Sequence, residues 1–472
     1  MGTRVLLVSC YELGRQPLHV ATAAAFLRDA GHEVRALDLA VDDFDASLVR
    51  WAETVALAVP MHTAMRLAVG VAERVRGLHP AATIVLYGLY APLCAASLPP
   101  GAADHAVGGE FEEELVRIAD GRPSGRRVVL DRLRFPVPAR DLLPPLSRYA
   151  RLMIDGEARP AAAIELTRGC VHRCRHCPVP AVYGGRLRVV QQETLLADVD
   201  QLVEMGAMHL SFADPDFLNA APYALRAVRS LHQRHPSLSF DITTKVEHIL
   251  EHRALWPELH GLGLLFAITA AESTSDTVLG VLEKGHTHAQ TLAAVRLLRE
   301  HGIEPRPSLL PFTPWTTLRD YLDLLDFILD EKLLGSVDPV QLSIRLLLPP
   351  DSLLLEREEL RPHLRAYQPE SFSHRWEHPD PRMDVLQTDL TSLIAARTDA
   401  GDTPHAVHGA VRARAAAAAA AAGVTWAAGR RPLPAATAEP PRLSESWFCC
   451  AEPTSLQHAR SGLRPLPAAG SI

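Results

Sequence analysis

Short apolar runs alternate with amphipathic stretches along the first 120 residues. Apolar runs bounded by turn residues are typical of buried β-strands, and they lie at 4–9, 32–39, 54–60, 83–88 and 104–110. The stretches between them have helical spacing; in 17–31, Pro17 and Gly31 are boundary signals. Five strands alternating with helices predict a doubly wound, flavodoxin-like α/β domain, which binds ligands at the carboxyl ends of its strands.

A second alternating region extends from about 161 to 345. Its apolar runs predict strands at 161–166, 208–214, 238–244, 262–269, 304–310 and 340–347, with amphipathic helices between them. Six strand–helix units in one domain predict a full or partial parallel (β/α) barrel. In such barrels the chemistry lies on the loops that follow the strands.

The remaining segments have weaker patterns. The proline-rich stretch "FPVPARDLLPPLSRYA" predicts a linker along the surface, and "RARAAAAAAAAG" predicts a helix that ends at Gly423. The chain therefore divides into a first domain, a linker, a barrel, a helical or irregular extension, and a proline-rich tether with a tail, at 1–122, 123–158, 159–350, 351–430 and 431–472.

Composition narrows the class of protein. The 472 residues are 47% hydrophobic and 22% charged, with a net charge of −7, which is ordinary for a globular protein and does not favour a nucleic-acid surface. The apolar run at the N-terminus is too short for a signal-peptide core, and no run is long enough to span a bilayer. We expect a soluble, cytoplasmic protein without nucleic-acid or membrane partners.

Three of the seven cysteines lie within eight positions, directly after the first predicted barrel strand. Cys170, Cys174 and Cys177 have the spacing C-x-x-x-C-x-x-C. A structural zinc site would need a fourth ligand, such as His172 or His176. Redox chemistry at Cys174 and Cys177 would leave Cys170 without a role. An iron–sulfur cluster held by three thiolates would leave one iron open for a ligand. The residues alone leave these three interpretations open.

This spacing in this context resembles the signature of the radical S-adenosylmethionine (SAM) superfamily. The resemblance implies a 4Fe–4S cluster on the three cysteines. It also implies a free iron that chelates the amino and carboxylate groups of SAM, and cleavage of the sulfonium to a 5′-deoxyadenosyl radical. The family usually has an aromatic residue before the last cysteine; here it is His176, whose backbone would face the adenine.

Two further segments fit the same family. "SFADPDF" occupies the position where the family contacts the methionine amino group, which makes Asp214 and Asp216 candidates although the usual Gly-Gly-Glu is absent. "AITAAESTSDTVLGVLEKGHT" resembles a segment of the cobalamin-linked branch and implies that Glu272 and Ser273 lie near SAM. The alternative for Asp214 and Glu272 is a carboxylate at a helix N-terminus.

The same branch carries a cobalamin-binding domain before the barrel, and residues 1–120 match its layout. The resemblance implies corrinoid contacts from loops after strands, by His19, Thr63, Gly88, Gly109 and Glu110. The motif D-x-H-x-x-G, which supplies a histidine to cobalt in other cobalamin proteins, is absent. Either the cobalt lacks a protein histidine, or the domain keeps the fold without the cofactor. The alternative for His19 is a histidine on a packed helix face.

The tail contains "CCAEP" at 449–453, which resembles a small subgroup of radical SAM proteins named for this ending. A disulfide between Cys449 and Cys450 would be strained, because adjacent Cα atoms are only about 3.8 Å apart. Such a pair suits redox chemistry or a soft ligand. The alternative is two buried packing cysteines.

We therefore expect a radical SAM enzyme with a 4Fe–4S cluster, SAM and cobalamin as cofactors. Its substrate is expected to be a small molecule or a peptide, and its reductant a flavodoxin or ferredoxin. With cobalamin, the family's commonest outcome is methylation of an unactivated carbon, which makes the protein a transferase. The alternatives are a cobalamin-independent radical enzyme and a non-enzymatic metal-binding scaffold whose tail docks a partner.

Overall fold

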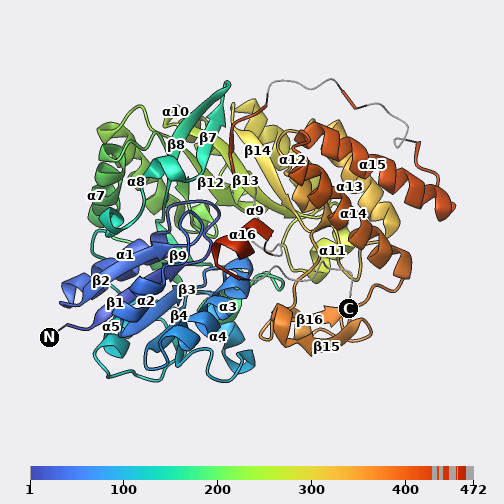
Figure 1. The fold of residues 1–472 in the computed structure, drawn as a ribbon. Coiled ribbons are helices and arrows are strands. Elements are labelled where there is room, and N and C mark those ends of the chain that lie inside the picture. The colour runs from blue at the N-terminus through green and yellow to red at the C-terminus, as the bar shows by residue number, and fades with distance from the viewer. Residues whose placement is uncertain (1, 428–432, 435–438, 446–452, 454, 464–472) are drawn as a thin grey trace.

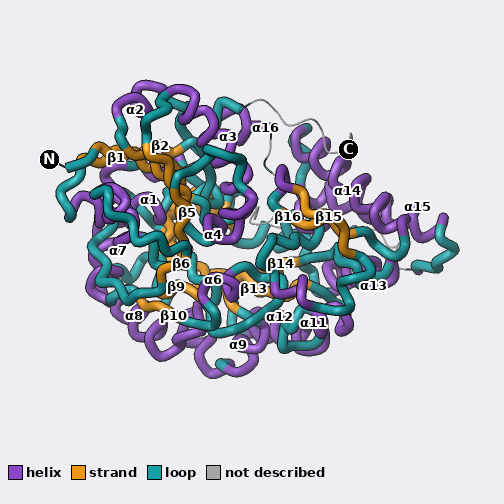
Figure 2. The backbone as a smooth tube through the Cα atoms, turned by 90° about the horizontal axis from the view of Figure 1, so that it is seen from below, coloured by secondary structure: helices purple, strands orange, loops and turns teal. Residues whose placement is uncertain are grey.

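The computed structural model describes residues 2–427, 433–434, 439–445, 453 and 455–463. Two β-sheets, each with helices on its outer faces, lie against one another, and the helices α14 (Pro381–Asp399) and α15 (Pro404–Ala421) pack at the far side of the second sheet (Figure 1). The view from below shows the same arrangement, with α14 and α15 farthest from the N-terminal domain (Figure 2). Cys449 and Cys450 lie outside the described residues.

The N-terminal sheet is parallel, with strand order β2-β1-β3-β4-β5-β6. This order confirms the flavodoxin-like prediction, with the short β6 added at one edge. The strands are β1 (Arg4–Ser9), β2 (Glu33–Asp38), β3 (Thr54–Ala58), β4 (Thr83–Tyr87), β5 (His105–Gly109) and β6 (Val128–Val129). The helices are α1 (Leu18–Asp29), α2 (Ala46–Trp51), α3 (His62–Leu78), α4 (Tyr90–Cys94) and α5 (Glu112–Ala119).

Alternate residues of the central strands face two separate apolar cores. Val5 and Leu7 of β1 pack with α1 and α5, whereas Leu6 and Val8 pack with α2, α3 and α4. The sequence of a strand that is buried on both faces is a continuous apolar run, as in "RVLLVS". Because the strands are parallel, all their carboxyl ends lie at one edge, and Glu112, which follows β5 at that edge, contacts Arg168 of the second domain.

The second sheet has seven strands in the order β14-β13-β12-β11-β8-β7-β17. Five of them are parallel, and β7 and β17 run antiparallel to their neighbours. The strands are β7 (Arg151–Ile154), β8 (Glu157–Ile164), β11 (His209–Phe212), β12 (Ser239–Thr244), β13 (Leu264–Glu272), β14 (Glu304–Leu309) and β17 (Arg442–Leu443). A two-stranded sheet, β9 (Thr167–Gly169) with β10 (Leu187–Val189), follows β8.

The second sheet curls into a partial barrel. Its outer face packs against helices whose bounds are α7 (Gln192–Glu204), α8 (Ala221–Arg234), α9 (Val246–Glu251), α10 (Trp256–Gly261), α12 (His288–Glu300) and α13 (Leu318–Asp330). Two short helices pack elsewhere: α6 (Val179–Tyr183) joins a core of the N-terminal domain, and α11 (Asp276–Val281) packs with residues that follow β14. On the inner face, Leu152 of β7 and Leu443 of β17 meet Phe266 and Ile268 of β13. The two antiparallel strands thus close the curl by side-chain contact.

The sixth predicted barrel strand, at 340–347, is absent. Residues Pro339–Ser343 form a turn of 3₁₀-helix, and a single bridge joins Phe312 to Arg345. The preceding strand β14 contains Pro305 and Pro307, which lack the N–H that a further strand would need. Proline within a sheet is confined to edge strands, so β14 ends the sheet.

The predicted linker is folded into the junction between the domains. Arg140 is fully buried, and its guanidinium donates to both carboxylate oxygens of Asp198 at 3.0 and 2.8 Å. It also donates to the Ala163 carbonyl at 2.7 Å and to Gln16 Oε1 at 3.3 Å. One side chain thus connects the loop after β1, strand β8 and helix α7.

The C-terminal region returns to the N-terminal domain. A hairpin and two helices, β15 (Leu364–Gln368), β16 (Ser373–Trp376), α14 (Pro381–Asp399) and α15 (Pro404–Ala421), extend the barrel. Beyond them, Tyr11 donates to Glu445 at 2.9 Å, and α16 (Ser455–Arg460) reaches the Ala40 carbonyl through Arg460.

Among the described residues, no helix combines the length and apolarity that a membrane span requires.

The buried Arg140–Asp198 pair generates a stability prediction. Replacing Asp198 with Ala leaves a buried guanidinium without its carboxylate, which costs about 3–5 kcal/mol. The matched control is Glu157→Ala, which breaks the exposed pair with Arg159 and costs less than about 1 kcal/mol. Denaturant unfolding of both variants measures the two losses, and equal losses would contradict a structural role for Arg140.

Candidate functional site

The cysteine loop begins where β8 and β9 deliver the chain to the carboxyl edge of the second sheet. Gly169 precedes Cys170 and has φ +77°. A Cβ there would lie 2.2 Å from the Arg186 carbonyl oxygen and 2.7 Å from the Tyr183 ring. Only glycine permits this close turn, which fixes where the first cysteine leaves the strand.

All three cysteines of the loop are free thiols that lie close enough to influence one another. Cys170 and Cys174 are buried and Cys177 is partly so, and the Cys177 amide donates to the Cys174 carbonyl at 3.2 Å. Burial raises the pKa of Cys177 to about 12, and the other two cysteines add to the rise. Three mutually repelling thiolates in a buried loop require a cation to ionise together, as metal ligands do.

A buried ion pair lies beside the loop. Glu272 Oε1 is 3.2 Å from Lys284 Nζ and 3.5 Å from His176 Nε2. Burial alone would raise the pKa of Glu272, but Lys284 and His176 hold that pKa at about 2. The Lys284 ammonium also interacts electrostatically with Cys174 and Cys177. The structure thus brings two predicted SAM residues, Glu272 and His176, together at the cysteines.

Lys284 was not predicted, although the sequence contains a signal for it. Of 48 basic residues only three are lysines, and two of those, Lys245 and Lys284, are buried near the cysteine loop. Lysine offers a compact charge where arginine would offer a planar fork. Ser273 lies in the same segment, buried, with its hydroxyl accepting from the Ser275 amide at 3.1 Å.

The two predicted aspartates have different surroundings. Asp214 accepts from the Leu166 amide at 2.9 Å and the Thr167 hydroxyl at 2.6 Å, so it ties the end of β11 to the chain before the cysteines. Burial raises the pKa of Asp214 to about 7, although the two hydrogen bonds lower it in part. Asp216 caps the turn that follows it by accepting from the Leu218 amide; the capping alternative was weighed for Asp214 and Glu272, but it is Asp216 that caps a turn.

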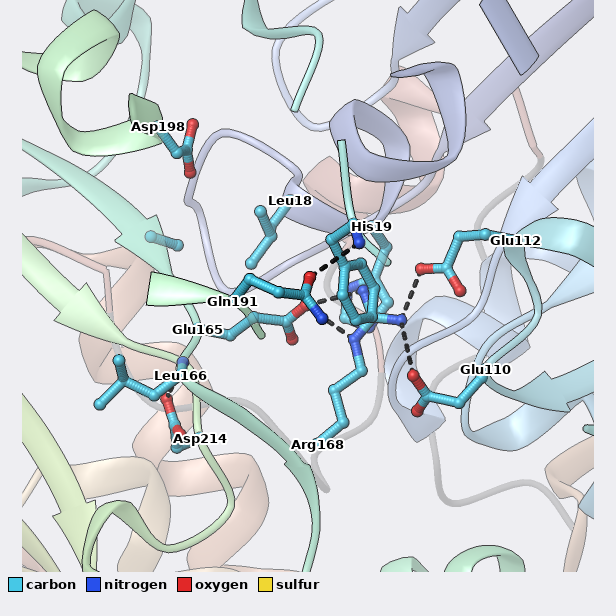
Figure 3. Close-up of polar contacts among 12 residues, drawn as sticks. Leu18, His19, Glu110, Glu112, Glu165, Leu166, Arg168, Gln191, Asp198 and Asp214 are labelled. Carbon is cyan, nitrogen blue, oxygen red and sulfur yellow. Dashed lines mark hydrogen bonds and ion pairs between the residues drawn. The ribbon is translucent and has the colours of Figure 1, made fainter. Parts of the chain in front are cut away.

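A buried charge cluster joins the two domains (Figure 3). Arg168, at the centre of β9, donates to Glu165 at 2.7 Å and to Glu112 of the N-terminal domain at 2.5 Å. Glu110 lies 3.9 Å from the same guanidinium and accepts from the Tyr183 hydroxyl at 3.2 Å. Three carboxylates thus share one arginine, and two of them come from the carboxyl end of β5.

This cluster has more acceptors than donors. Oxygen Oε2 of Glu110 and of Glu112 has no hydrogen-bond partner among the described atoms, and both side chains are fully buried. Burial raises the pKa of Glu110 to about 7 and raises that of Glu112, although Arg168 opposes both shifts. A ligand that presents N–H donors or a cation would satisfy these oxygens.

The other predicted corrinoid contacts lie on the same side of the domain. His19 Nδ1 is 3.1 Å from Glu12, and its ring stacks on Phe111. Burial opposes protonation of His19, but Glu12 raises its pKa above the ordinary value. Thr63 is buried in the first turn of α3.

The glycines at the strand ends are required by the chain's own packing. A Cβ on Gly109 would lie 2.1 Å from the Val129 carbonyl oxygen, and one on Gly108 would lie 2.6 Å from Pro92. Gly88 has φ +115°, and a Cβ there would lie 3.1 Å from the Val59 carbonyl. Their presence is therefore explained without a ligand.

Comparison with known proteins agrees with this geometry. Residues 164–328 match the model of the radical SAM superfamily, from the last residue of β8 through the cysteine loop into α13. The chain contains a radical SAM domain.

Curated relatives of this chain include two methylases. Hopanoid C-3 methylase of Methylococcus capsulatus is 24% identical over 327 residues, which are 64% of this chain and 62% of that protein. Hopanoid C-2 methylase of Rhodopseudomonas palustris is 25% identical over 181 residues, 37% of this chain and 32% of that protein. The chain thus spans less than two thirds of the length of either relative.

Solved structures show the same fold over most of the chain. The cobalamin-dependent SAM radical enzyme OxsB, with aqua-cobalamin and SAM bound, has a TM-score of 0.67 and 14% identity and covers 87% of this chain and 72% of its own. The radical SAM methyltransferase TsrM from Kitasatospora setae, with cobalamin and a 4Fe–4S cluster bound, has a TM-score of 0.63 and 16% identity, covering 89% and 100%. The radical SAM domain therefore follows a flavodoxin-like domain, as the sequence predicts.

The raised pKa of Glu110 generates a pH prediction. Between its ordinary value of 4.5 and about 7, the unfolded chain loses this proton while the folded chain keeps it. The free energy of unfolding therefore falls as the pH rises through that window. Glu110→Gln removes this loss, so the variant gains on the order of 1–3 kcal/mol relative to the wild type between about pH 5 and pH 8.

Melting temperatures of the two proteins across that range measure the effect. Glu113→Gln, an exposed neighbour on α5, is the matched control. Parallel curves for Glu110→Gln and the wild type would contradict a proton held at Glu110.

Proposed function

We propose that this protein is a radical SAM enzyme that uses a 4Fe–4S cluster, SAM and cobalamin, and that its reaction is a methyl transfer to a small-molecule or peptidic substrate. The observation that carries the proposal is the position of the cysteine loop. It lies at the carboxyl edge of a parallel half-barrel, against the carboxyl edge of a flavodoxin-like sheet. Tyr183 and Val182, which follow the loop, pack into the core of the N-terminal domain.

The donor set around the loop fits a cluster better than a zinc ion. Zinc would need a fourth ligand beside the three cysteines. His172 Nε2 lies 3.3 Å from His248, and His176 Nε2 lies 3.5 Å from Glu272, whereas His176 Nδ1 has no hydrogen-bond partner. Among the described residues, the three cysteines belong to no group of ligand atoms that lie within 4.8 Å of one another, as the ligands of a single zinc ion do. Three thiols spread more widely match a 4Fe–4S cluster with one open iron. Such a cluster supplies the electron that cleaves SAM.

The residues beside the loop suit the polar groups of SAM. Glu272, held ionised by Lys284, is a hydrogen-bond acceptor that does not need to lose a proton at neutral pH. The His176 backbone lies within the loop itself, and Ser273 follows Glu272 on the same strand end. Asp214 braces the chain before Cys170. We assign SAM contact to His176, Glu272 and Ser273, and place Asp214 and Asp216 behind them.

The inter-domain cluster suits a corrinoid. The edge of a corrin ring carries amide side chains, and Glu110 and Glu112 offer buried oxygens without donors. His19, in the first turn of α1, is oriented by Glu12 at Nδ1 and by the Phe111 ring, an arrangement that suits a metal-ligating histidine whose Nε2 faces the metal. Cobalamin supplies a methyl carrier. The structures of OxsB and TsrM with cobalamin bound, and the likeness to the hopanoid methylases, support this assignment. The proposal also requires an external reductant such as a flavodoxin or ferredoxin.

The cluster assignment is tested by iron analysis. Anaerobic reconstitution should give about four irons and four sulfides per wild-type chain. Cys174→Ala should lose most of both, because two thiolates do not hold a cubane cluster. Cys94→Ala, a buried cysteine of the N-terminal domain, is the control and should keep them. Cluster-level iron in Cys174→Ala would refute the ligand assignment, and colourless zinc in the wild type would favour the scaffold alternative.

The corrinoid assignment is tested by retention of hydroxocobalamin. After incubation and desalting, the spectrum of the wild type should show bound corrinoid at about one per chain. Glu112→Leu should reduce retention at least about tenfold, since losing a charged hydrogen bond costs about 1.5–3 kcal/mol. Glu113→Leu, exposed on the same helix, should bind normally. If the wild type keeps its cluster but retains no corrinoid, the corrinoid assignment is wrong, and a cobalamin-independent radical enzyme is the interpretation that remains.

We also propose that Cys449 and Cys450 act as redox or soft-ligand groups at this site. The described residue nearest before them, Glu445, is bonded to Tyr11 in the loop after β1. Four residues span at most about 14 Å, so Cys449 can reach that loop. A Cys449→Ser, Cys450→Ser variant should keep full iron and still cleave SAM to 5′-deoxyadenosine with dithionite. It should fail to convert the substrate; normal turnover, or loss of the cluster, would refute the proposal.

A further inference from the structure

A short segment near the end of the chain closes the open side of the half-barrel. Residues 439–445, the strap, lie between β14 and β7 (Figure 1). On the β14 side, Arg306 donates to the Pro441 carbonyl at 3.4 Å, and a Cβ on Gly335 would lie only 2.6 Å from Pro440. On the other side, β17 pairs antiparallel with β7. The strap thus bridges the gap that the curled sheet leaves between its first and last strands.

The strap is held by few contacts. Its strand β17 has only two residues, Arg442 and Leu443. Next to them, the Ser444 amide donates to the Arg151 carbonyl at 2.8 Å, and the Arg151 amide donates to the Ser444 hydroxyl at 3.0 Å. None of the strap's residues is buried. A segment with so few buried contacts opens locally at a small cost in free energy, while the rest of the protein stays folded.

The strap also encloses a cavity against the inner face of the half-barrel. The cavity has a volume of about 30 Å³, and its lining includes apolar side chains and charged ones: Phe266, Ile268, Leu443, Arg306, Asp338 and Glu445. That volume holds about two water molecules, which is too little for an organic substrate. Because Leu443 and Glu445 belong to the strap, the cavity becomes open and larger when the strap detaches.

The end of the strap is fastened to the N-terminal domain. Tyr11, in the loop after β1, is buried and donates to Glu445 at 2.9 Å. Glu445 also lies directly against Gly14 of this loop, where a Cβ would be 2.8 Å from the glutamate side chain. The same loop carries Glu12, which contacts His19 at the proposed corrinoid site. The strap therefore joins the two domains beside the candidate site.

We infer that the strap is a gate: it closes the side entrance of the half-barrel, and the substrate enters when the strap detaches from β7 and Tyr11. This inference rests on the proposed function, which places the reaction at the carboxyl edge of the half-barrel. Closure after entry would exclude water and protect a reactive intermediate. The alternative is a permanent wall, with the substrate entering between the two domains.

Hydrogen exchange at the Ser444 amide, measured on the anaerobically reconstituted full-length protein, separates a gate from a wall. A gate predicts exchange at least about 100-fold faster than at the amides of β11 and β12, because the strap opens without global unfolding. It also predicts exchange at least about tenfold slower than in an unfolded peptide, because the strap is closed most of the time. Exchange as slow as in β11 and β12, or as fast as in an unfolded peptide, would overturn the inference.

Two variants weaken the strap at different points. Tyr11→Phe keeps the ring and removes the hydrogen bond to Glu445, so exchange at Ser444 should become about tenfold faster. Leu443→Ala removes the apolar contact with β13 and should act in the same direction, which keeps the test available if Tyr11→Phe does not fold. Tyr223→Phe, which loses a hydrogen bond to the Val190 carbonyl on the outer face, is the matched control and should change nothing.

Entry into the cavity is measured with Ile268→Cys, whose new thiol lies behind the strap. Its reaction with a maleimide, followed by mass spectrometry at position 268, should be slow with the strap intact. Adding Tyr11→Phe or Leu443→Ala should accelerate it by the same factor as the exchange at Ser444. If the strap opens more often in these variants but the labelling rate stays the same, the entrance lies elsewhere and the inference is wrong.

Iron and sulfide are measured in every sample, so the two proposals fail separately. Neither exchange nor labelling requires the cluster, SAM or a known substrate. A strap that behaves as a permanent wall in protein with a full cluster would overturn the gate and leave the proposed function intact. A wild type that takes up no cluster would refute the proposed function, and with it the assignment of the side opening as a substrate entrance.

Discussion

The buried guanidinium of Arg168 is the interaction on which the arrangement of this protein depends. It pairs with Glu165 in its own domain and with Glu112 at the end of the N-terminal sheet. Removing charges from water costs several kcal/mol per ion, and only close contact between opposite charges offsets that cost. Because the carboxylates that contact Arg168 come from both domains, this offset requires the two carboxyl edges to face each other. The junction is thus fixed by electrostatics rather than by apolar area alone.

The candidate site follows from that constraint. The carboxyl edge of the half-barrel presents the cysteine loop, and the carboxyl edge of the N-terminal sheet presents Glu110 and Glu112. Parallel sheets bind ligands at these edges, so two candidate ligand sites are brought against one another. The N-terminal one depends on the second domain, because Arg168 and Tyr183 supply the donors that Glu110 and Glu112 contact.

Much of the fold could be predicted because its signals are local. Apolar runs located the five N-terminal strands, and cysteine spacing located the loop, since both depend on neighbours in the chain. The strand predicted at 340–347 does not form, because Pro305 and Pro307 of β14 lack the N–H groups that a further strand would need. The residues 340–347 carry no signal of this, since the prolines lie in a different strand.

The residues that the sequence did not reveal interact across long separations. Arg168 meets Glu112, and His248 meets His172, only after the domains and the barrel have formed. Arginine and histidine are common enough that no local pattern distinguished Arg168 or His248. Lysine differs, because its scarcity could have singled out Lys245 and Lys284. The glycines at 88 and 109 were located correctly, but the chain's own carbonyls account for them.

The central claim is that the cluster and the corrinoid occupy one inter-domain site. Pulsed EPR of the protein loaded with cob(II)alamin tests it directly, because a reduced 4Fe–4S cluster nearby is a second paramagnetic centre. The account predicts that reducing the cluster broadens the cob(II)alamin signal and shortens its relaxation time. A cobalt signal that is unchanged, while the same sample shows the spectrum of the reduced cluster, would contradict the account.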